Sequence, residues 1–145
     1  MLGGGGVDAA IHEAAGPDLL EYCKKLEGCP TGQTKLTPGF DLPAKNILHT
    51  VGPIWHGGNM GEAELLRSCY QSSLKLAAGL SLKTVAFPAI STGVYGYPAE
   101  KAANIAVSTI LNFCQTPSSL EEITLVAFSD HDLHTLQKSV EKYNT

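Results

Sequence analysis

An alternation of apolar strands and helices in the second half of the chain constrains the fold more than any other feature. The apolar segments 83–89 and 123–128 are each followed by a loop and then by apolar residues at helical spacing. Strands that alternate with helices pair in parallel through right-handed crossovers, so that helices cover the sheet. We expect 83–89 to be a buried strand. Because 123–128 has no polar alternation after Thr124, we expect it to be covered on both faces.

The first half of the chain supplies further helices and strands. Asp8 can cap a short helix that ends near Ala15, and Pro17 can begin a second helix, since proline is favoured at that position. Strand-like segments follow at 33–37 and 46–51, and a long helix is expected at 62–78, before Gly79.

The last helices complete the expected fold. Apolar residues at helical spacing predict a helix from about 99 to 113 or 114, and Ser129 has the spacing of a helix cap with Asp132. In that final helix Leu133, Leu136 and Val140 should face inward. The sequence predicts a single α/β domain over residues 1–145, with about four strands, five helices and a mixed, largely parallel sheet between helical layers.

Composition excludes several classes of function. The chain has 145 residues, 43% of them hydrophobic and 17% charged, with no apolar stretch long enough for a membrane span. No signal peptide is evident, so a cytoplasmic location is expected. The net charge is −4 and the ten Lys and Arg residues are scattered, which argues against nucleic-acid binding. A small anion would have to be held by main-chain N–H groups.

Cysteines and histidines do not indicate a metal site. The cysteines have no C-x-x-C spacing, so we expect small buried thiols rather than a disulfide framework or a zinc site. They are Cys23, Cys29, Cys69 and Cys114. His131 and His134 lie three residues apart without a third ligand nearby, and we expect them to face solvent. We therefore predict no metal and no cofactor.

Two glycine-rich loops could hold a phosphate. Gly3–Asp8 and Ser91–Pro98 each lead into a helix, and glycines allow main-chain N–H groups to approach a ligand closely. In the second loop, Tyr95 or Tyr97 could lie against a sugar ring. The alternative is a plain turn into a helix.

Five other side chains could take part in chemistry or contact a ligand. Asp8 and His12 lie one helical turn apart and project from the same face, where a carboxylate could position a water molecule. The alternative is a helix cap and a surface histidine. Phe128 could stack on a base or pack in the core. Trp55 and His56, in a glycine-rich loop, could cover either a ligand or the core.

Four stretches of the chain resemble the ADP-ribose-binding macro domain, specifically the MacroD-type branch that includes bacterial O-acetyl-ADP-ribose deacetylases. They are GGGGVDAAIHEAAGP, CPTGQTKLTPGFDLPAKNILHTVGP, LLRSCYQSSL and VAFPAISTGVYGYP. The resemblance implies a three-layer α/β/α fold, ADP-ribose or an ADP-ribosylated molecule or protein as the ligand, and hydrolysis of an ester on its distal ribose.

The resemblance also implies roles for individual residues. Asp8 matches the acidic residue that orients the attacking water, and His12 matches the histidine one turn later. Tyr95 matches the aromatic residue on the distal ribose, and Phe128 the one near adenine. The full set of implied ligand-binding residues is Gly4, Gly5, Gly6, Val7, Ser91, Thr92, Gly93, Val94, Tyr95, Gly96, Tyr97 and Phe128.

The chain departs from the family pattern at its start. Similar domains carry two strands before the glycine loop, with an aspartate that reads adenine and an asparagine that binds the distal ribose. The second of these strands lies inside the sheet, so we expect a gap in a shortened fold. Each buried unpaired main-chain group costs about 1–3 kcal/mol, against a total stability of about 5–15 kcal/mol. We therefore expect the flanking strands to pair directly, or a second copy to contribute a segment in a homodimer.

Three functions remain open at this point. The first is hydrolysis of an ADP-ribosyl ester, and the second is retention of ADP-ribose without turnover, which the absent asparagine would favour. The third is a structural or oligomerisation unit that has lost ligand binding. A nicotinamide oxidoreductase does not fit, because the Gly-x-Gly-x-x-Gly turn and its preceding strand are not laid out here.

Overall fold

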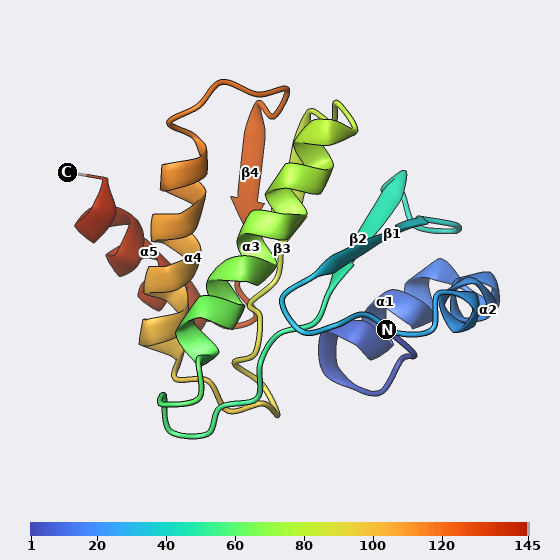
Figure 1. Ribbon diagram of the computed structural model, residues 1–145, viewed down its shortest axis with the longest axis horizontal. Helices are drawn as coiled ribbons and strands as arrows, with labels where there is room; N and C mark the ends of the chain where they lie inside the picture. The colour runs from blue at the N-terminus through green and yellow to red at the C-terminus, as the bar shows by residue number, and fades with distance from the viewer. Residues whose placement is uncertain (145) are drawn as a thin grey trace.

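The computed structural model describes residues 1–144, which contain five helices and four strands joined by loops (Figure 1). This number and mixture of elements confirm the fold class expected from the sequence. The helices are α1 (Gly6–Ala15), α2 (Pro17–Lys25), α3 (Glu62–Gly79), α4 (Ala99–Phe113) and α5 (Asp130–Tyr143). The strands are β1 (Thr34–Pro38), β2 (Asn46–Thr50), β3 (Thr84–Phe87) and β4 (Glu122–Leu125).

The four strands form two separate two-stranded sheets. β1 and β2 are antiparallel, with Thr34 opposite Thr50, whereas β3 and β4 are parallel, with Thr84 opposite Glu122. Within residues 1–144, β2 and β3 are not paired with each other. The expected gap in the sheet is therefore present, and the alternative in which the flanking strands pair directly is wrong.

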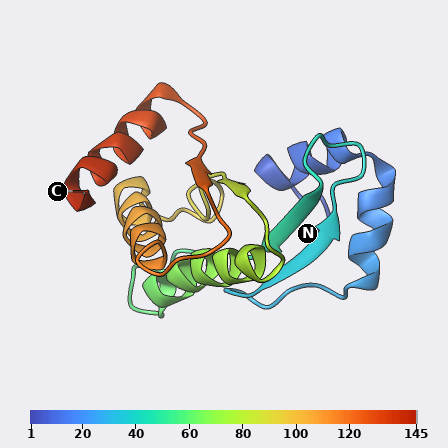
Figure 2. The same cartoon turned by 90° about the horizontal axis from the view of Figure 1, so that it is seen from above.

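Two helices cover one face of the β3–β4 pair and supply most of the core. α3 and α4 pack on each other, and α3 also contacts both β1 and β2, so that it runs beneath both pairs of strands (Figure 2). The core cluster consists of Leu66, Tyr70, Leu74, Phe87, Tyr97, Ala102, Ala106 and Ile110. A smaller cluster of Ala15, Leu19 and Cys23 joins α1 to α2. Each pair of strands therefore has its own apolar support.

The other face of the β3–β4 pair is open to solvent. Ala86 and Thr124 are exposed, and the Val126 side chain just after β4 is half exposed. The predictions of a buried strand at 83–89 and of a strand covered on both faces at 123–128 were therefore wrong. α3 and α4 pack on one face only, and α5 packs on α4. An apolar strand sequence does not specify whether a second layer lies above it.

The final helix presents a different face from the expected one. Ser129 caps α5 as predicted, since its Oγ accepts a hydrogen bond of 3.1 Å from the Asp132 N–H. Leu133 and Val140 are exposed, however, and Ser139 is buried and hydrogen bonded to Asn104 of α4 at 2.7 Å. The inward orientation predicted for these two apolar residues was wrong, because α5 packs on α4 through a partly polar face.

The cysteines confirm one part of the sequence prediction and correct another. All four thiols are free, and Cys23 and Cys69 are buried. Cys29 is only partly buried and Cys114 is exposed, which contradicts the expectation of four buried thiols. Among the described residues, no helix is both long enough and apolar enough to cross a membrane.

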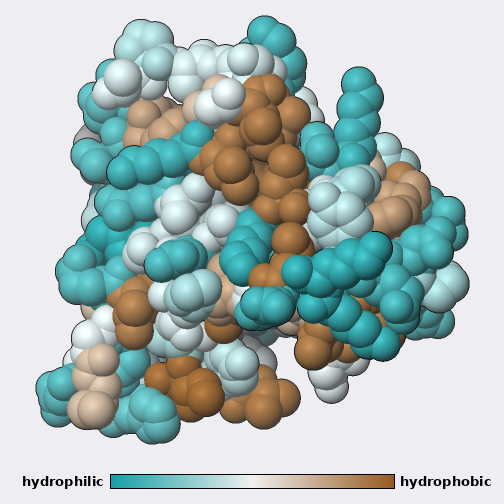
Figure 3. All heavy atoms as spheres, turned by 45° about the vertical axis from the view of Figure 1, so that its right-hand side comes forward, coloured by the Kyte–Doolittle hydropathy of each residue, from teal (hydrophilic) through white to brown (hydrophobic). Residues whose placement is uncertain are grey.

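The open edges of β2 and β3 predict self-association. An unpaired strand edge is a template for another strand. Figure 3 also shows apolar side chains gathered in a stripe on the surface of the molecule, and such a stripe favours contact with another protein surface. We expect a homodimer at low micromolar concentration, in which each copy contributes an extended segment to its partner. Size-exclusion chromatography with light scattering measures the mass. A monomer that unfolds in one cooperative transition would contradict this prediction.

Buried His49 predicts a loss of stability in weak acid. Its side chain is 8% exposed in β2, and its Nε2 lies 2.9 Å from the Oγ1 of Thr37. Burial lowers the pKa of His49 from 6.5 to about 4, so the folded protein holds this imidazole neutral. The unfolded chain takes up a proton below pH 6.5, which makes the free energy of unfolding fall between pH 6.5 and about 4.

Urea titrations across that pH range measure the effect. The slope of unfolding free energy against pH should decrease in His49→Gln, whereas the exposed-residue control His134→Gln should keep the wild-type slope. Equal slopes in all three proteins would exclude His49 as the group responsible.

Candidate functional site

Both glycine-rich loops lie at the same edge of the molecule. The first loop leads into α1 and the second joins β3 to α4, and Figures 1 and 2 both place them as neighbours. They come from the two halves of the structure, since α1 packs with α2 on the β1–β2 side. The structure therefore brings together the two segments that the sequence singled out.

The first loop presents free main-chain donors. α1 begins at Gly6 with Gly5 as its cap, so Asp8 is not the helix cap that the sequence predicted. Gly3 and Gly6 have φ angles of +79° and +56°, which glycine adopts without strain. The N–H groups of residues 5–8 make no hydrogen bond to any residue that the structure describes. The first turn of a helix with free N–H groups attracts an anion.

Asp8 is tied to the loop before it. Its Oδ2 accepts hydrogen bonds from the N–H of Gly3 at 2.8 Å and of Gly4 at 3.3 Å, and lies 3.2 Å from the amino group of Met1. Burial by itself would raise the pKa of Asp8, but these hydrogen bonds and the amino group outweigh it and hold the pKa below the usual value. The Asp8 carboxyl is therefore ionised at neutral pH.

His12 faces Asp8 across one turn of α1. Its Nε2 lies 3.5 Å from the Oδ1 of Asp8 and 2.6 Å from the main-chain oxygen of Met1. The His12 side chain is only 11% exposed. The structure thus confirms that the two side chains share a face of α1, and the alternative of a surface histidine is wrong.

The second loop also carries free donors. The N–H of Tyr97 donates to the Ser91 oxygen at 2.9 Å and that of Gly96 donates to Gly93 at 3.0 Å, which folds the loop back on itself. The N–H groups of residues 92–95 have no hydrogen-bond partner among residues 1–144. Ser91 has a φ of +66°, a left-handed conformation that is strained for a residue other than glycine. The loop is folded, but its tip is free to bind.

The aromatic residues of the site differ in their exposure. Tyr97 is 3% exposed and packs on Trp55 with ring centroids 4.7 Å apart, so it belongs to the core and its ring cannot lie against a ligand. Tyr95 is 39% exposed. Phe128 is 96% exposed, which excludes the alternative of core packing. Tyr95 and Phe128 are thus the aromatic side chains that a ligand could reach.

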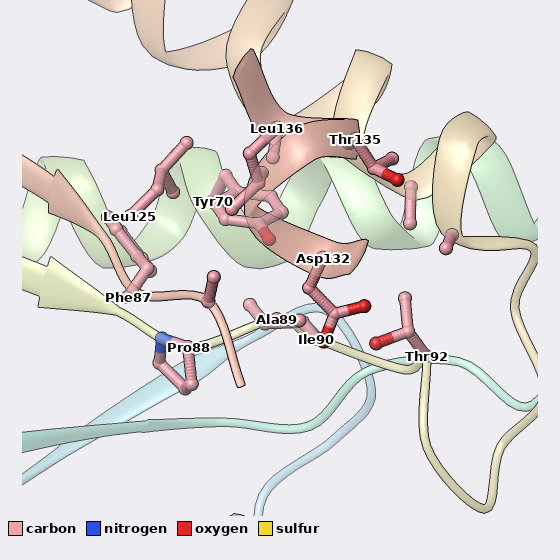
Figure 4. A pocket seen from close by; sticks show the side chains of 15 residues that line it. Tyr70, Phe87, Pro88, Ala89, Ile90, Thr92, Leu125, Asp132, Thr135 and Leu136 are labelled. Atoms are coloured by element: carbon pink, nitrogen blue, oxygen red, sulfur yellow. The ribbon is translucent and has the colours of Figure 1, made fainter. Parts of the chain in front are cut away.

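A pocket lies behind the second loop, between the ends of β3 and β4 and the helices α4 and α5. Thr92, Asp132 and Thr135 lie along one side of it, and Phe87 and Leu125 lie opposite (Figure 4). A second hollow lies beside the first loop and is lined by Gly3 and His12. Each loop thus borders its own hollow. No group of three or more metal-ligating side chains occurs in the described part of the chain.

The sequence analysis missed the contribution of Glu62, the first residue of α3. This carboxylate is 1% exposed, and its oxygens accept hydrogen bonds from the N–H of His56, Gly58 and Met60 at 2.9, 2.8 and 2.6 Å. Burial opposes ionisation, but these bonds lower the pKa of Glu62 to about 2. The sequence offered one signal for this role, an acidic residue directly after a glycine-rich loop. That signal is not specific, because acidic residues are common in the first turn of any helix.

Trp55 belongs to the same loop and covers the core. Its side chain packs against the core cluster, and the Nζ of Lys101 lies 5.6 Å from its ring centroid. Its main-chain N–H donates to the main-chain oxygen of Tyr95 at 2.8 Å. Of the two alternatives that the sequence left open for Trp55, covering a ligand or covering the core, the structure shows the second. His56 is exposed. As predicted, His131 and His134 are also exposed.

Curated relatives match nearly the whole chain. A macro domain-containing protein of Chlorobaculum tepidum is 56% identical over 140 residues, which cover 97% of this chain and 81% of that protein. A protein of Enterobacter cloacae named O-acetyl-ADP-ribose deacetylase is 51% identical over 142 residues, covering 95% of this chain and 79% of the relative.

Solved structures share the fold. The Oceanobacillus iheyensis macrodomain with ADP has a TM-score of 0.93 and 44% identity, covering 97% of this chain and 77% of that one. The Trypanosoma brucei macrodomain in complex with ADP-ribose has a TM-score of 0.90 and 42% identity, covering 96% of this chain and 58% of the other. The family model of the Macro domain matches residues 1–106. With this match and these identities, the chain belongs to the Macro domain family.

Proposed function

We propose that this protein binds ADP-ribose and hydrolyses an ester on its distal ribose, such as O-acetyl-ADP-ribose or ADP-ribosylated Asp or Glu. One observation carries the proposal. Two neighbouring loops each present a set of main-chain N–H groups without a hydrogen-bond partner in residues 1–144, at residues 5–8 in the first loop and at residues 92–95 in the second. A diphosphate carries two negative charges and many acceptor oxygens. Main-chain amides at a helix start and in a turn are suited to such an anion.

The charges of the protein agree with main-chain recognition. The net charge of −4 provides no general attraction for an anion, so the local donors must supply the binding free energy. Hydrogen bonds to a charged acceptor contribute about 1.5–3 kcal/mol each. Because association itself costs about 4–15 kcal/mol of lost translational and rotational freedom, we expect most of the free amides, rather than one or two, to contribute to binding.

Asp8 is the residue that we assign to the chemical step. Its Oδ1 does not bind the loop amides and can accept a hydrogen bond from a water molecule, which orients the water toward the ester carbonyl. The water oxygen forms a bond to the carbonyl carbon, and the bond from that carbon to the ribose oxygen breaks. The ribose oxygen takes up a proton, and acetate or the carboxyl side chain leaves.

The names and bound ligands of related proteins support the proposed activity. The Enterobacter cloacae relative is named for deacetylation of O-acetyl-ADP-ribose, and a Klebsiella pneumoniae relative that is 48% identical carries the same name. The macrodomain structures from Oceanobacillus iheyensis and Trypanosoma brucei contain ADP and ADP-ribose. Several other relatives are named only as macro domain-containing proteins.

Binding without turnover is the second candidate. The contacts of Asp8 favour it, because Oδ2 is already engaged by Gly3 and Gly4 and only Oδ1 is left to orient a water molecule. Calorimetry with ADP-ribose beside a turnover assay separates the two functions. Heat of binding without released acetate would identify a binding module, and no heat at millimolar ligand would exclude both.

Replacing Asp8 tests the chemical step. Asp8→Asn keeps a side-chain oxygen for the Gly3 amide but removes the charge, so turnover of O-acetyl-ADP-ribose should fall about 10²- to 10⁴-fold, far more than any loss of ADP-ribose affinity from a less ordered loop. Acetate release measures turnover and calorimetry measures binding. The control Asp18→Asn changes an exposed carboxylate in the first turn of α2 and should behave as wild type. Undiminished turnover in Asp8→Asn would remove Asp8 from the mechanism.

Replacing the two tyrosines separates binding from stability. Tyr95→Ala removes a partly exposed ring, so ADP-ribose affinity should fall about tenfold with little change in the free energy of unfolding. Tyr97→Ala removes a core ring and should cost about 3–5 kcal/mol of stability. Calorimetry and urea titration measure the two effects. If Tyr95→Ala leaves affinity intact, the ligand does not contact this ring.

A further inference from the structure

A loop outside the two glycine-rich segments holds the second of them in place. Residues 52–61 connect β2 to α3 without regular secondary structure, and Gly57, Gly58 and Gly61 have φ angles of +96°, +94° and +76°. Backbone of this kind has no ladder of hydrogen bonds to order it. Its order must therefore come from other contacts.

Glu62 supplies that order. Its buried carboxylate accepts the main-chain N–H groups of His56, Gly58 and Met60, which wraps the loop around a single side chain at the start of α3. No cation lies within ion-pair distance of Glu62 in residues 1–144, so these amides and the helix start compensate its charge. Removing the carboxylate would leave donors of the loop without an acceptor.

The ordered loop then contacts the second glycine-rich loop at three places. The main-chain N–H of Trp55 donates to the main-chain oxygen of Tyr95 at 2.8 Å, and the Trp55 ring packs on Tyr97. A Cβ atom at Gly52 would collide with the Oγ of Ser91, so the two loops are in direct contact there. Ser91 holds a left-handed φ of +66°, and such a conformation persists only where surrounding contacts enforce it.

We propose that Glu62 is a positioning residue for the ADP-ribose site, which aims the amides of residues 92–95 by way of Trp55. This inference rests on the proposed function for its ligand. Glu62 does not touch the ligand itself. It fixes the loop that fixes the Tyr95 carbonyl, and the Tyr95 carbonyl lies within the stretch whose N–H groups are free.

The test compares Glu62→Gln with the control Glu64→Gln. Glu64 lies in the same first helical turn, but its side chain is 80% exposed and pairs with Arg67 on the surface. Glu62→Gln replaces one acceptor oxygen with a donor that faces main-chain N–H groups. Calorimetry should show ADP-ribose affinity reduced at least about tenfold in Glu62→Gln and within twofold of wild type in Glu64→Gln.

Two readouts do not require a ligand. The chain has one tryptophan, so fluorescence reports Trp55 alone, and Glu62→Gln should shift its emission to longer wavelength. Hydrogen exchange should become about tenfold faster at the hydrogen-bonded amides of residues 52–61 and at those of Gly96 and Tyr97 in the second loop, and stay unchanged in β1 and β2. If exchange rises in 52–61 but not in 91–97, or rises uniformly, the inference is overturned.

The outcomes separate this inference from the proposed function. Wild type that binds no ADP-ribose defeats the proposed function, while the exchange pattern still decides whether Glu62 orders residues 91–97. A folded Glu62→Gln with altered Trp55 emission and wild-type affinity overturns the positioning role. If Glu62→Gln does not fold, Glu62→Asp, which keeps the charge on a shorter side chain, is measured in the same way, and an affinity and exchange pattern equal to wild type would then overturn it.

Discussion

Hydrogen bonds between carboxylates and main-chain amides determine the shape of the candidate site. Asp8 binds the amides of Gly3 and Gly4, and Glu62 binds those of His56, Gly58 and Met60. In both places a negative side chain orders a glycine-rich segment that has no strand to support it. The amides of residues 5–8, which follow the first segment, and those of residues 92–95, in the loop that the second segment contacts, make no hydrogen bond within residues 1–144 and can bind an anion. The same chemistry that folds the loops thus prepares them for a phosphate group.

The site depends on α3 because the two loops belong to different halves of the molecule. One half contains β1, β2 and the helices before them, and the other contains β3, β4 and the last helices, with no strand pairing between the halves in residues 1–144. α3 contacts both halves. On the β1 side, hydroxyls of Ser68 and Ser72 donate to the Gly32 oxygen at 2.8 and 3.0 Å. The hydrogen bonds of Ser68 and Ser72 on one side of α3, and the apolar core on its other side, therefore set the distance between the two glycine-rich loops.

Elements with one complete apolar face could be predicted from the sequence, and elements whose surroundings decide their burial could not. α4 begins at Ala99 and ends at Phe113 as predicted, because its alanines and aliphatic residues pack on α3 and β3. The segment 123–128, which includes most of β4, is also largely apolar, yet Val126 beyond the end of the strand is half exposed, since no layer covers that face. In the site, helical spacing correctly placed Asp8 beside His12. The role of Glu62 could not be predicted in this way, because it depends on main-chain amides up to six residues earlier, in a loop with no regular spacing of residues.

Recognition by main-chain amides changes which substitutions matter. No side-chain replacement removes an N–H group from residues 5–8 or 92–95, except replacement by proline, so the ligand contacts themselves resist mutation. The direction of those N–H groups is sensitive to neighbours that never meet the ligand. Gly52 is one example, because any side chain there would collide with Ser91 and displace a strained turn of the second loop. Binding should therefore be most sensitive to substitution of the residues that hold the loops, and Glu62 and Gly52 are the positions where the geometry shows it most directly.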